Sequence, residues 1–326
     1  MPQPKLSEII LPVKKDLDSF NDKFKSSLKS KVGLVDLVTK YILKQKGKKI
    51  RPVLVLLSSG LCGGVTDRSY RGAVLVEMLH TATLVHDDVV DSAEKRRGLP
   101  SINAVWKNKV AVLIGDYLLS RGLMLAVDGN DFDFLRVVTE TVKRMSEGEL
   151  LQISKTRKLD IDEDTYYKII SDKTASLIST CCEIGARSTT EDKETIQNLR
   201  EFGEALGIAF QIRDDILDYT GKSSIIGKPL GGDIKEKKIT LPLIHSLKQV
   251  DKNESDRIIK LIKSERKKGR IKEVIEFVKK NKGIEFAEAE AQKYAEKAKN
   301  SIQKLPDSEY KNSLNSLVDF VVNRKN

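Results

Sequence analysis

Apolar residues recur at helical spacing along almost the whole of this 326-residue chain, and this periodicity limits the folds that the chain can adopt. Strand-like alternation is rare, and aromatic residues make up only 6% of the sequence. Hydrophobic residues account for 40%, which is enough for a sizeable core, and no Pro-, Gly- or Ser-rich linker divides the chain. We therefore predict an all-α fold formed by a single domain that spans residues 1–326.

Helix-breaking and helix-capping residues divide this periodic pattern into segments. The predicted helices are Ile9–Leu28, Leu34–Leu43, one opened by Pro52 that ends near Gly60, one from Asp67 to Asp91, Val110–Leu125, Phe134–Leu151, Asp162–Ile184, Thr190–Leu206, Ile208–Asp218 and others from Leu241 onward. Ser101 and Asn103 are candidate N-caps. A loop is expected from Gly221 to Gly232, and breaks near Gly283 and Pro306.

Two acidic boxes of one design stand at the ends of apolar, helix-compatible runs. They read Asp87-Asp88-Val89-Val90-Asp91 and Asp214-Asp215-Ile216-Leu217-Asp218. On a helix, positions i and i+4 lie on one face with i+1 beside them, so each box directs three carboxylates toward one spot. Clustered carboxylates repel one another unless a cation lies between them, and oxygen-only ligands favour Mg²⁺ over Zn²⁺. The two boxes therefore predict a cage for hard divalent cations.

The first box lies at a helix end where negative charge is electrostatically unfavourable. It lies at the predicted C-terminal end, just before the break at Arg96-Arg97-Gly98. Carboxylates at that end oppose the helix dipole, so folding gains nothing from them there. Local departures of this kind often mark functional sites, and a metal-binding role would account for this one.

Basic residues occur near both boxes and in the mid-chain. They are Lys48, Lys49, Arg51, Arg96, Arg97, Lys173, Lys228 and Lys238. A diphosphate group is bound by metal ions together with guanidinium or ammonium donors. Acidic boxes combined with these cations therefore predict a diphosphate-binding site.

Several motifs, taken in order, resemble those of the trans-isoprenyl diphosphate synthases, or polyprenyl synthetases. The two signature regions are Glu77–Asp91 and Gly207–Asp218, which contain the acidic boxes. The supporting motifs, in the family's order, are Lys48–Pro52, Arg96–Gly98, Gly115–Leu119, Glu147–Gln152, Lys173–Ala175 and Gly227–Asp233. The resemblance covers most of the chain, and two complete boxes with these companions make it specific.

This resemblance implies a fold, a reaction and a set of site residues. The fold is an isoprenoid-synthase-type bundle of roughly a dozen helices around a central cavity, usually as a homodimer. The reaction joins isopentenyl diphosphate head to tail to an allylic diphosphate, with Mg²⁺, about three ions per site, as cofactor. The implied metal ligands are Asp87, Asp88, Asp91, Asp214, Asp215 and Asp218. The implied catalytic residues are Lys173, Thr174, Gln211 and Lys228. The implied substrate contacts are Lys48, Arg51, His80, Arg96, Arg97 and Lys238.

Product length in this family depends on the residues that precede the first box, because they line the tunnel into which the product grows. Ala82 and Thr83 are both small here, and the next residues down the helix are Leu79 and Met78. Since no large aromatic residue blocks the way, we expect a medium or long product of about six to eight isoprene units, as for a quinone side chain. A geranylgeranyl or farnesyl product is the alternative.

Other functions fit the sequence less well. A terpene cyclase or head-to-head condensing enzyme would not need Lys48, Arg51 and His80 for a second diphosphate. A noncatalytic subunit of a heteromeric synthase would typically lack box residues that are intact here. The net charge of +11 lies partly in a Lys-rich stretch without a nucleic-acid-binding motif, so no nucleic acid partner is expected.

The remaining features predict a cytoplasmic protein. Three cysteines without a C-x-x-C pair are typical of a reducing compartment, and the N-terminus lacks a signal-peptide pattern. The most apolar early run is too short to span a bilayer, so any membrane contact would be peripheral and through the product. At the C-terminus, Arg324 and Lys325 are expected to form a frayed end, and the alternative is that they reach over a diphosphate.

Overall fold

The computed structural model describes residues 5–45, 47–221, 230–264 and 269–324, and nearly all of them lie in helices. The elements are α1 (Leu6–Ile9), η1 (Leu11–Val13), α2 (Lys14–Ser27), α3 (Gly33–Lys44), α4 (Ile50–Cys62), α5 (Asp67–Val90), β1 (Lys95–Arg96), β2 (Leu99–Pro100), α6 (Ile102–Asp128), α7 (Phe132–Lys158), α8 (Glu163–Ile170), η2 (Ser171–Ala175), α9 (Ser176–Arg187), α10 (Lys193–Thr220), α12 (Gly232–Lys235), α13 (Leu241–Lys248), α14 (Lys252–Lys263), α15 (Arg270–Lys280), α16 (Gly283–Ser301) and α17 (Glu309–Asn323). The prediction of an all-α fold is confirmed.

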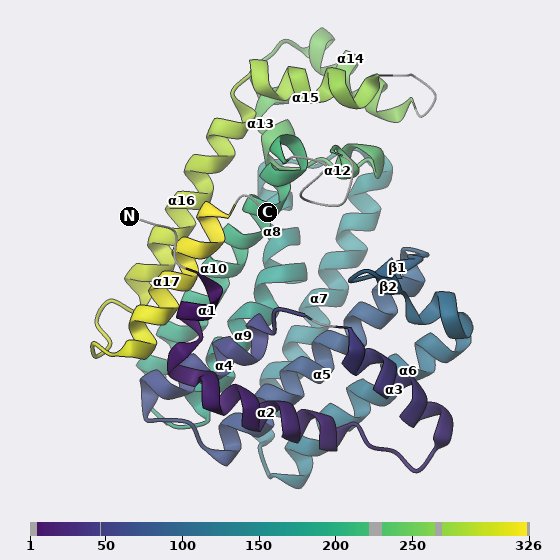
Figure 1. Cartoon of the computed structure of the whole chain (residues 1–326). Coiled ribbons are helices and arrows are strands. Elements are labelled where there is room, and N and C mark those ends of the chain that lie inside the picture. The colour runs from purple at the N-terminus through teal and green to yellow at the C-terminus, as the bar shows by residue number, and fades with distance from the viewer. Residues whose placement is uncertain (1–4, 46, 222–229, 265–268, 325–326) are drawn as a thin grey trace.

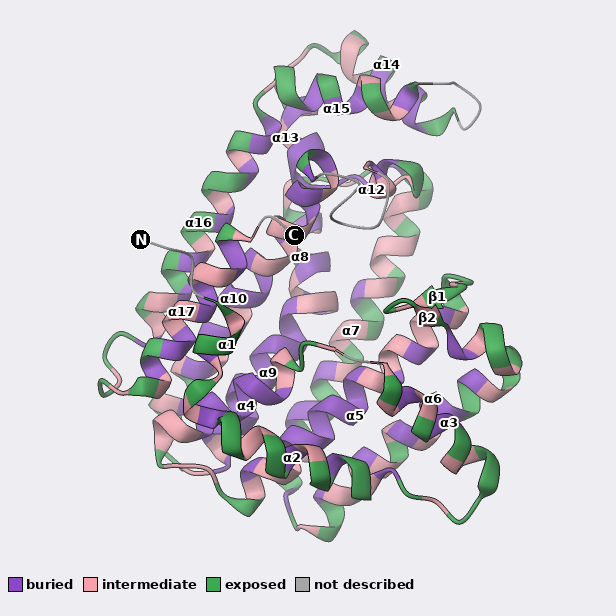
Figure 2. Ribbon diagram, viewed as in Figure 1, coloured by how far each residue is buried: buried purple, intermediate pink, exposed green. Residues whose placement is uncertain are grey.

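The long helices form one bundle (Figure 1). Helix α5 packs along α6, α9 lies against both α4 and α10, and α10 also packs along α16. Buried apolar residues form two clusters, one centred on α4, α5 and α9 and the other on α10, α13 and α16 (Figure 2). The bundle therefore brings the two predicted acidic helices, α5 and α10, into one framework.

Three segment predictions need correction. The predicted helix Ile9–Leu28 is interrupted by the 3-10 turn η1, which contains Pro12. The predicted helix Asp162–Ile184 contains the π turn η2 between α8 and α9. No break separates Leu206 from Ile208, because α10 is continuous there. Gly207 lies inside that helix where an added Cβ would come within 2.5 Å of the Cα of Ala175, so its role is close helix packing.

The segment after the first box forms a short antiparallel hairpin, β1–β2, in which Lys95 pairs with Pro100. Ser101 caps the next helix, since its Oγ accepts a hydrogen bond from the Ala104 amide. The other predicted cap is wrong, because Asn103 lies inside the helix and donates to the Ala93 carbonyl. This anchoring holds the turn that carries Arg96 and Arg97 close to the end of α5.

Helix α6 is the one described helix that is long and apolar enough to cross a bilayer by length and composition alone. It packs along α5 and against α7, so in this structure it is part of the bundle. Only a third of its most apolar stretch is buried, however, which leaves an apolar face uncovered in the single chain.

Candidate active site

The first acidic box occupies the last turn of α5, as the sequence predicts. Asp87 and Asp88 lie in the helix and Asp91 is its C-cap residue. Asp88 is buried and accepts two hydrogen bonds from Arg96, from Nε at 2.9 Å and from Nη2 at 2.5 Å. The hairpin after α5 therefore places an arginine directly on the first box.

The second box lies near the end of α10, and each of its carboxylates has a different partner. Asp214 Oδ1 accepts from Arg324 Nη2 at 2.5 Å. Asp215 is buried and accepts from the Tyr166 hydroxyl at 2.6 Å and from Gln211 Nε2 at 2.9 Å. Asp218 accepts from the backbone amides of residues 232 and 233, at 2.9 and 3.0 Å, which ties the start of α12 to the box.

The chemistry of these carboxylates suits a cation, because all of them offer oxygen donors. Among the described residues no three His, Cys, Asp or Glu side chains converge as a ready metal site. Burial raises the pKa of Asp87, and the nearby carboxylates of Glu149 and Asp91 raise it further, while the positive charge of Lys173 lowers it. Oxygen donors in such a region of surplus negative charge fit a hard divalent ion, which would remove the repulsion.

A cavity lies between the second box and the π turn. Its polar lining includes Gln152, Lys173, Thr174, Gln211, Asp215, Asp233 and Lys238. Thr174 donates to Gln211 Oε1 at 3.0 Å, and Lys173 donates to Gln152 Oε1 at 3.1 Å and pairs with Glu149. The structure thus brings together three of the predicted catalytic residues, whereas Lys228 lies outside the described residues.

Charge effects join the first box to this cavity. Lys173, which lines the cavity, is close enough to Asp87 to lower its pKa. Burial lowers the pKa of Lys238, but its hydrogen bond to Glu236 and the charges of nearby carboxylates, Asp91 among them, raise it overall. The charges of two first-box residues, Asp87 and Asp91, therefore reach the two lysines of the cavity that Asp215 of the second box lines.

A second group of predicted substrate contacts lies beside the N-terminal part of α4. Arg51 Nη1 lies 2.9 Å from His80 Nε2. A neighbouring pocket is lined by Gly47, Lys49, Glu77 and Arg97 among others, and an added Cβ at Gly47 would meet the Arg97 guanidinium at 2.6 Å. Arg51, His80, Glu77 and Arg97 therefore form one charged cluster, which can bind an anion.

Lys48 lies apart from that cluster, toward the second box. Its ammonium group is 6.0 Å from the ring centre of Phe320, and its charge lowers the pKa of Asp214, which burial raises. The predicted substrate contacts therefore lie in more than one place, since Lys238 lines the cavity, Arg96 and Arg97 line the neighbouring pocket, and Lys48 lies near Asp214.

His80 gives this cluster a pH dependence. Burial lowers its pKa well below the usual 6.5, and the charges of Arg51, Arg97 and Arg96 lower it further. The folded protein thus keeps His80 neutral while the unfolded chain takes up a proton below about pH 6.5, so acidification destabilises the fold by up to about 1.4 kcal/mol per pH unit. Denaturant unfolding near pH 7 and pH 5 should show a smaller loss of stability for His80→Gln than for the unmodified protein. Equal losses would contradict this assignment.

Sequence reasoning missed three residues of the site. The prediction of a frayed end is wrong for Arg324, which binds Asp214 and the Phe210 carbonyl and lies 4.1 Å from the centre of the Phe210 ring. Lys325 lies outside the described residues. Tyr166 and Asp233 also reach the cavity. The Gly227–Asp233 motif pointed to Asp233, whereas nothing local marked Tyr166 or Arg324.

The predicted chain-length residues follow α5 away from the first box. Met78, Leu79 and Ala82 are buried, and Met78 faces α6 at Gly122, where an added Cβ would lie 3.3 Å from its Cβ. Thr83 is partly buried, one turn before Asp87, and its hydroxyl donates to the His80 carbonyl at 2.9 Å. Of these four residues, Thr83 therefore has the most room beside it.

Comparisons with known proteins point to one family. A family model described as polyprenyl synthetase matches residues 33–278. An all-trans-nonaprenyl-diphosphate synthase (geranyl-diphosphate specific) of Rhodobacter capsulatus is 36% identical over 97% of both chains. A heptaprenyl diphosphate synthase component 2 of Bacillus subtilis is also 36% identical, over 95% of this chain and 88% of that protein. Further relatives include octaprenyl and geranylgeranyl diphosphate synthases.

Solved structures share the whole fold. A polyprenyl synthase from Caulobacter crescentus complexed with calcium and isoprenyl diphosphate has a TM-score of 0.91 and 30% identity, covering 100% of both chains. The isoprenoid-synthase-type fold implied by the motifs is thus confirmed. This chain belongs to the polyprenyl synthetase family and is a trans-prenyltransferase that makes polyprenyl diphosphates.

Proposed function

We propose that this enzyme adds isopentenyl diphosphate head to tail to farnesyl or geranylgeranyl diphosphate, to make a product of about six to eight isoprene units for a quinone side chain. The observation that supports the proposal is that Asp215 of the second box lines one cavity with Lys173, Thr174, Gln211 and Lys238, while the charges of Asp87 and Asp91 of the first box reach its two lysines. A cavity lined by carboxylates and lysines, with further carboxylates close to those lysines, suits an allylic diphosphate and its metal ions.

The allylic diphosphate would lie between the two boxes. Bound Mg²⁺, about three ions, would supply Lewis-acid stabilisation of the departing diphosphate. Lys173, Lys238 and Arg96 would bind its oxygens as negative charge builds during cleavage of the allylic C–O bond, and Lys228 would join them. Thr174 and Gln211, hydrogen-bonded to each other, present oxygen dipoles toward the cation that remains.

Isopentenyl diphosphate would bind at the charged cluster beside α4. Arg51, Arg97 and Lys48 would contact its diphosphate, and neutral His80 can donate one hydrogen bond from Nδ1 while Nε2 accepts from Arg51. Its double bond then attacks the allylic cation and a proton is lost. We assign that proton to the released diphosphate, because it is the anion formed beside the reacting carbons.

One incubation tests the reaction and the product length together. Purified protein is given Mg²⁺, farnesyl diphosphate and excess isopentenyl diphosphate, and the products are sized by mass spectrometry. A ladder that ends at about six to eight units supports the proposal. A stop at geranylgeranyl length corrects the length and keeps the reaction. No product, with Mg²⁺ and diphosphate still bound, would favour a role as one subunit of a heteromeric synthase.

We infer that the uncovered face of α6 joins two copies of the chain. Val112, Leu113, Met124 and Val127 lie on this one face of α6 and are 40% to 59% exposed. Contiguous exposed apolar surface of this kind usually marks an interface, and the commonest soluble oligomer is a symmetric dimer. A second copy packed face to face would bury the same residues on both sides. The name of the Bacillus relative leaves a different partner chain as the alternative occupant.

A charge placed on this face should separate the copies. In Leu113→Glu, two carboxylates would be buried at the interface without partners, so we expect the variant to elute as a monomer. Light scattering coupled to size-exclusion chromatography measures the mass. Leu11→Glu, which alters an equally exposed leucine outside α6, is the matched control. If the Leu113 variant keeps the mass of a dimer, the interface lies elsewhere.

A further inference from the structure

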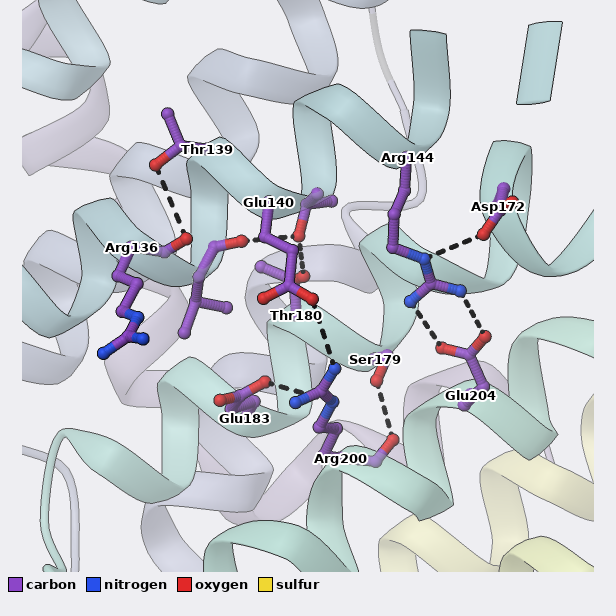
Figure 3. Close-up of polar contacts among 12 residues, drawn as sticks. Arg136, Thr139, Glu140, Arg144, Asp172, Ser179, Thr180, Glu183, Arg200 and Glu204 are labelled. Atoms are coloured by element: carbon purple, nitrogen blue, oxygen red, sulfur yellow. Dashed lines mark hydrogen bonds and ion pairs between the residues drawn. The ribbon is translucent and has the colours of Figure 1, made fainter. Parts of the chain in front are cut away.

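A network of charged side chains that do not line the cavity contacts the π turn (Figure 3). Arg144 of α7 donates from Nε to Asp172 Oδ1 at 2.8 Å. Its Nη2 donates to Glu204 Oε1 of α10 at 2.8 Å and to the Ser171 hydroxyl at 2.9 Å. One guanidinium thus connects α7, η2 and α10. Its two hydrogen bonds to residues of the turn are both shorter than 3 Å.

The turn that it holds is irregular. The Ser176 amide donates to the Ser171 carbonyl, five residues back, where an α-helix would bond four residues back. Single π turns inside helices are rare and frequently occur at functional sites. Lys173 and Thr174, which line the cavity, are two of the five residues in this turn.

Asp172 is held by more than one contact. It is 7% exposed, and its second oxygen accepts from Lys168 Nζ at 2.9 Å. Its carbonyl accepts from the Ser176 hydroxyl at 2.6 Å. On the α7 side, Gly148 lies so close that an added Cβ would be 3.0 Å from the Lys173 amide nitrogen. The backbone before Lys173 is therefore held by both side-chain oxygens of its neighbour and by close helix packing.

We propose that Arg144 is a positioning residue, which acts through Asp172 and Glu204 to aim Lys173 and Thr174 at the allylic diphosphate. The inference rests on the proposed function of those two residues. Of the described residues, Lys173 and Thr174 line the cavity, whereas Arg144, Asp172 and Glu204 do not. Arg144 therefore has no direct route to the substrate, and its effect on the reaction passes through the turn.

Removal of the guanidinium should slow the reaction more than it weakens substrate binding. A displacement of reacting groups by about 1 Å can cost about a hundredfold in rate, so we expect Arg144→Met to lower kcat at least about tenfold. The KM for isopentenyl diphosphate should stay within about twofold, since Arg51 and Arg97 lie elsewhere. Rates are measured where circular dichroism shows both proteins fully folded.

Helices α7, α9 and α10 offer a matched control. Arg200 of α10 pairs with Glu140 of α7 and Glu183 of α9, at 3.7 Å each, and it does not touch the π turn (Figure 3). Arg200→Met removes a guanidinium from the same helix junction, and we expect its kcat to match that of the unmodified enzyme. An equal loss in both variants would show general loosening of the junction and overturn the positioning role.

A double variant separates this inference from the proposed function. If Arg144 acts through the turn, Arg144→Met should cost little in a Lys173→Met, Thr174→Ala background, because the residues that it aims are already gone. Effects that multiply would overturn the inference while leaving the proposed function intact. Full activity of the Lys173→Met, Thr174→Ala enzyme itself would instead refute the roles assigned to those residues.

Discussion

Replacing Asp87 by Asn should lower kcat by about a hundred- to a thousandfold, the usual cost of one preorganised electrostatic group in an active site. The variant keeps the size of the side chain and removes one negative charge. Burial and the nearby carboxylates of Glu149 and Asp91 raise the pKa of Asp87, so its negative charge is costly unless a cation lies beside it. Loss of that charge should therefore leave folding unharmed while it weakens the hold on divalent cations.

The measurement pairs kinetics with direct metal binding. Activity is followed as Mg²⁺ is removed with a chelator and restored, and Mn²⁺ binding with a diphosphate is followed by electron paramagnetic resonance. Glu94→Gln, which neutralises an exposed carboxylate just after the box, is the matched control and should behave as the unmodified enzyme. Unchanged Mn²⁺ affinity in the Asp87 variant would remove this residue from the metal site.

Thr83→Phe should shorten the product to about geranylgeranyl length, because an aromatic ring one turn before Asp87 would block the growing chain. Thr83 is partly exposed, so the ring has space to enter, whereas Ala82 is 1% exposed and a phenylalanine there would overpack the core. The overall rate of the first condensation should change little, since the diphosphate contacts are untouched.

Products are sized by mass spectrometry at several ratios of the two substrates. Thr139→Phe serves as the control, because this exposed threonine of α7 likewise bonds a carbonyl of its own helix. If the Thr83 variant makes the same lengths as the unmodified enzyme at every ratio, the product does not pass this residue, and the tunnel assignment of Ala82, Leu79 and Met78 loses its basis.

Sequence reasoning predicted the fold well because most helices carry their own signals. The start of α5 at Asp67 and the cap at Ser101 depend on residues next to one another in the chain. The continuous α10 was missed because a glycine, here Gly207, often marks the end of a helix. Only the neighbouring Ala175 shows why glycine is needed there. The π turn was missed for a related reason, since helical periodicity cannot register one extra residue in a single turn.

The site was predictable where its residues come in motifs. Both acidic boxes, Lys173, Thr174 and Gln211 lie in short recognisable runs, and the structure brings Lys173, Thr174, Gln211 and Asp215 to one cavity. Arg324 and Tyr166 lie far along the chain from the carboxylates they bind, and no local pattern ties them together. Such pairings depend on tertiary packing, which single-sequence reasoning does not reach.

The π turn also sets how far α9 is rotated about its axis relative to α8. Each residue of an α-helix turns its successor by about 100°, so one residue more or less rotates everything beyond it by that angle. Helix α9 is buried along nearly its whole length, which fixes its rotation in the core. Deleting one residue from Ser171–Ala175 would restore regular helical hydrogen bonds, yet either α9 would lose its packing or Lys173 would leave the cavity. Regular backbone hydrogen bonding at this point would thus make the protein a poorer enzyme.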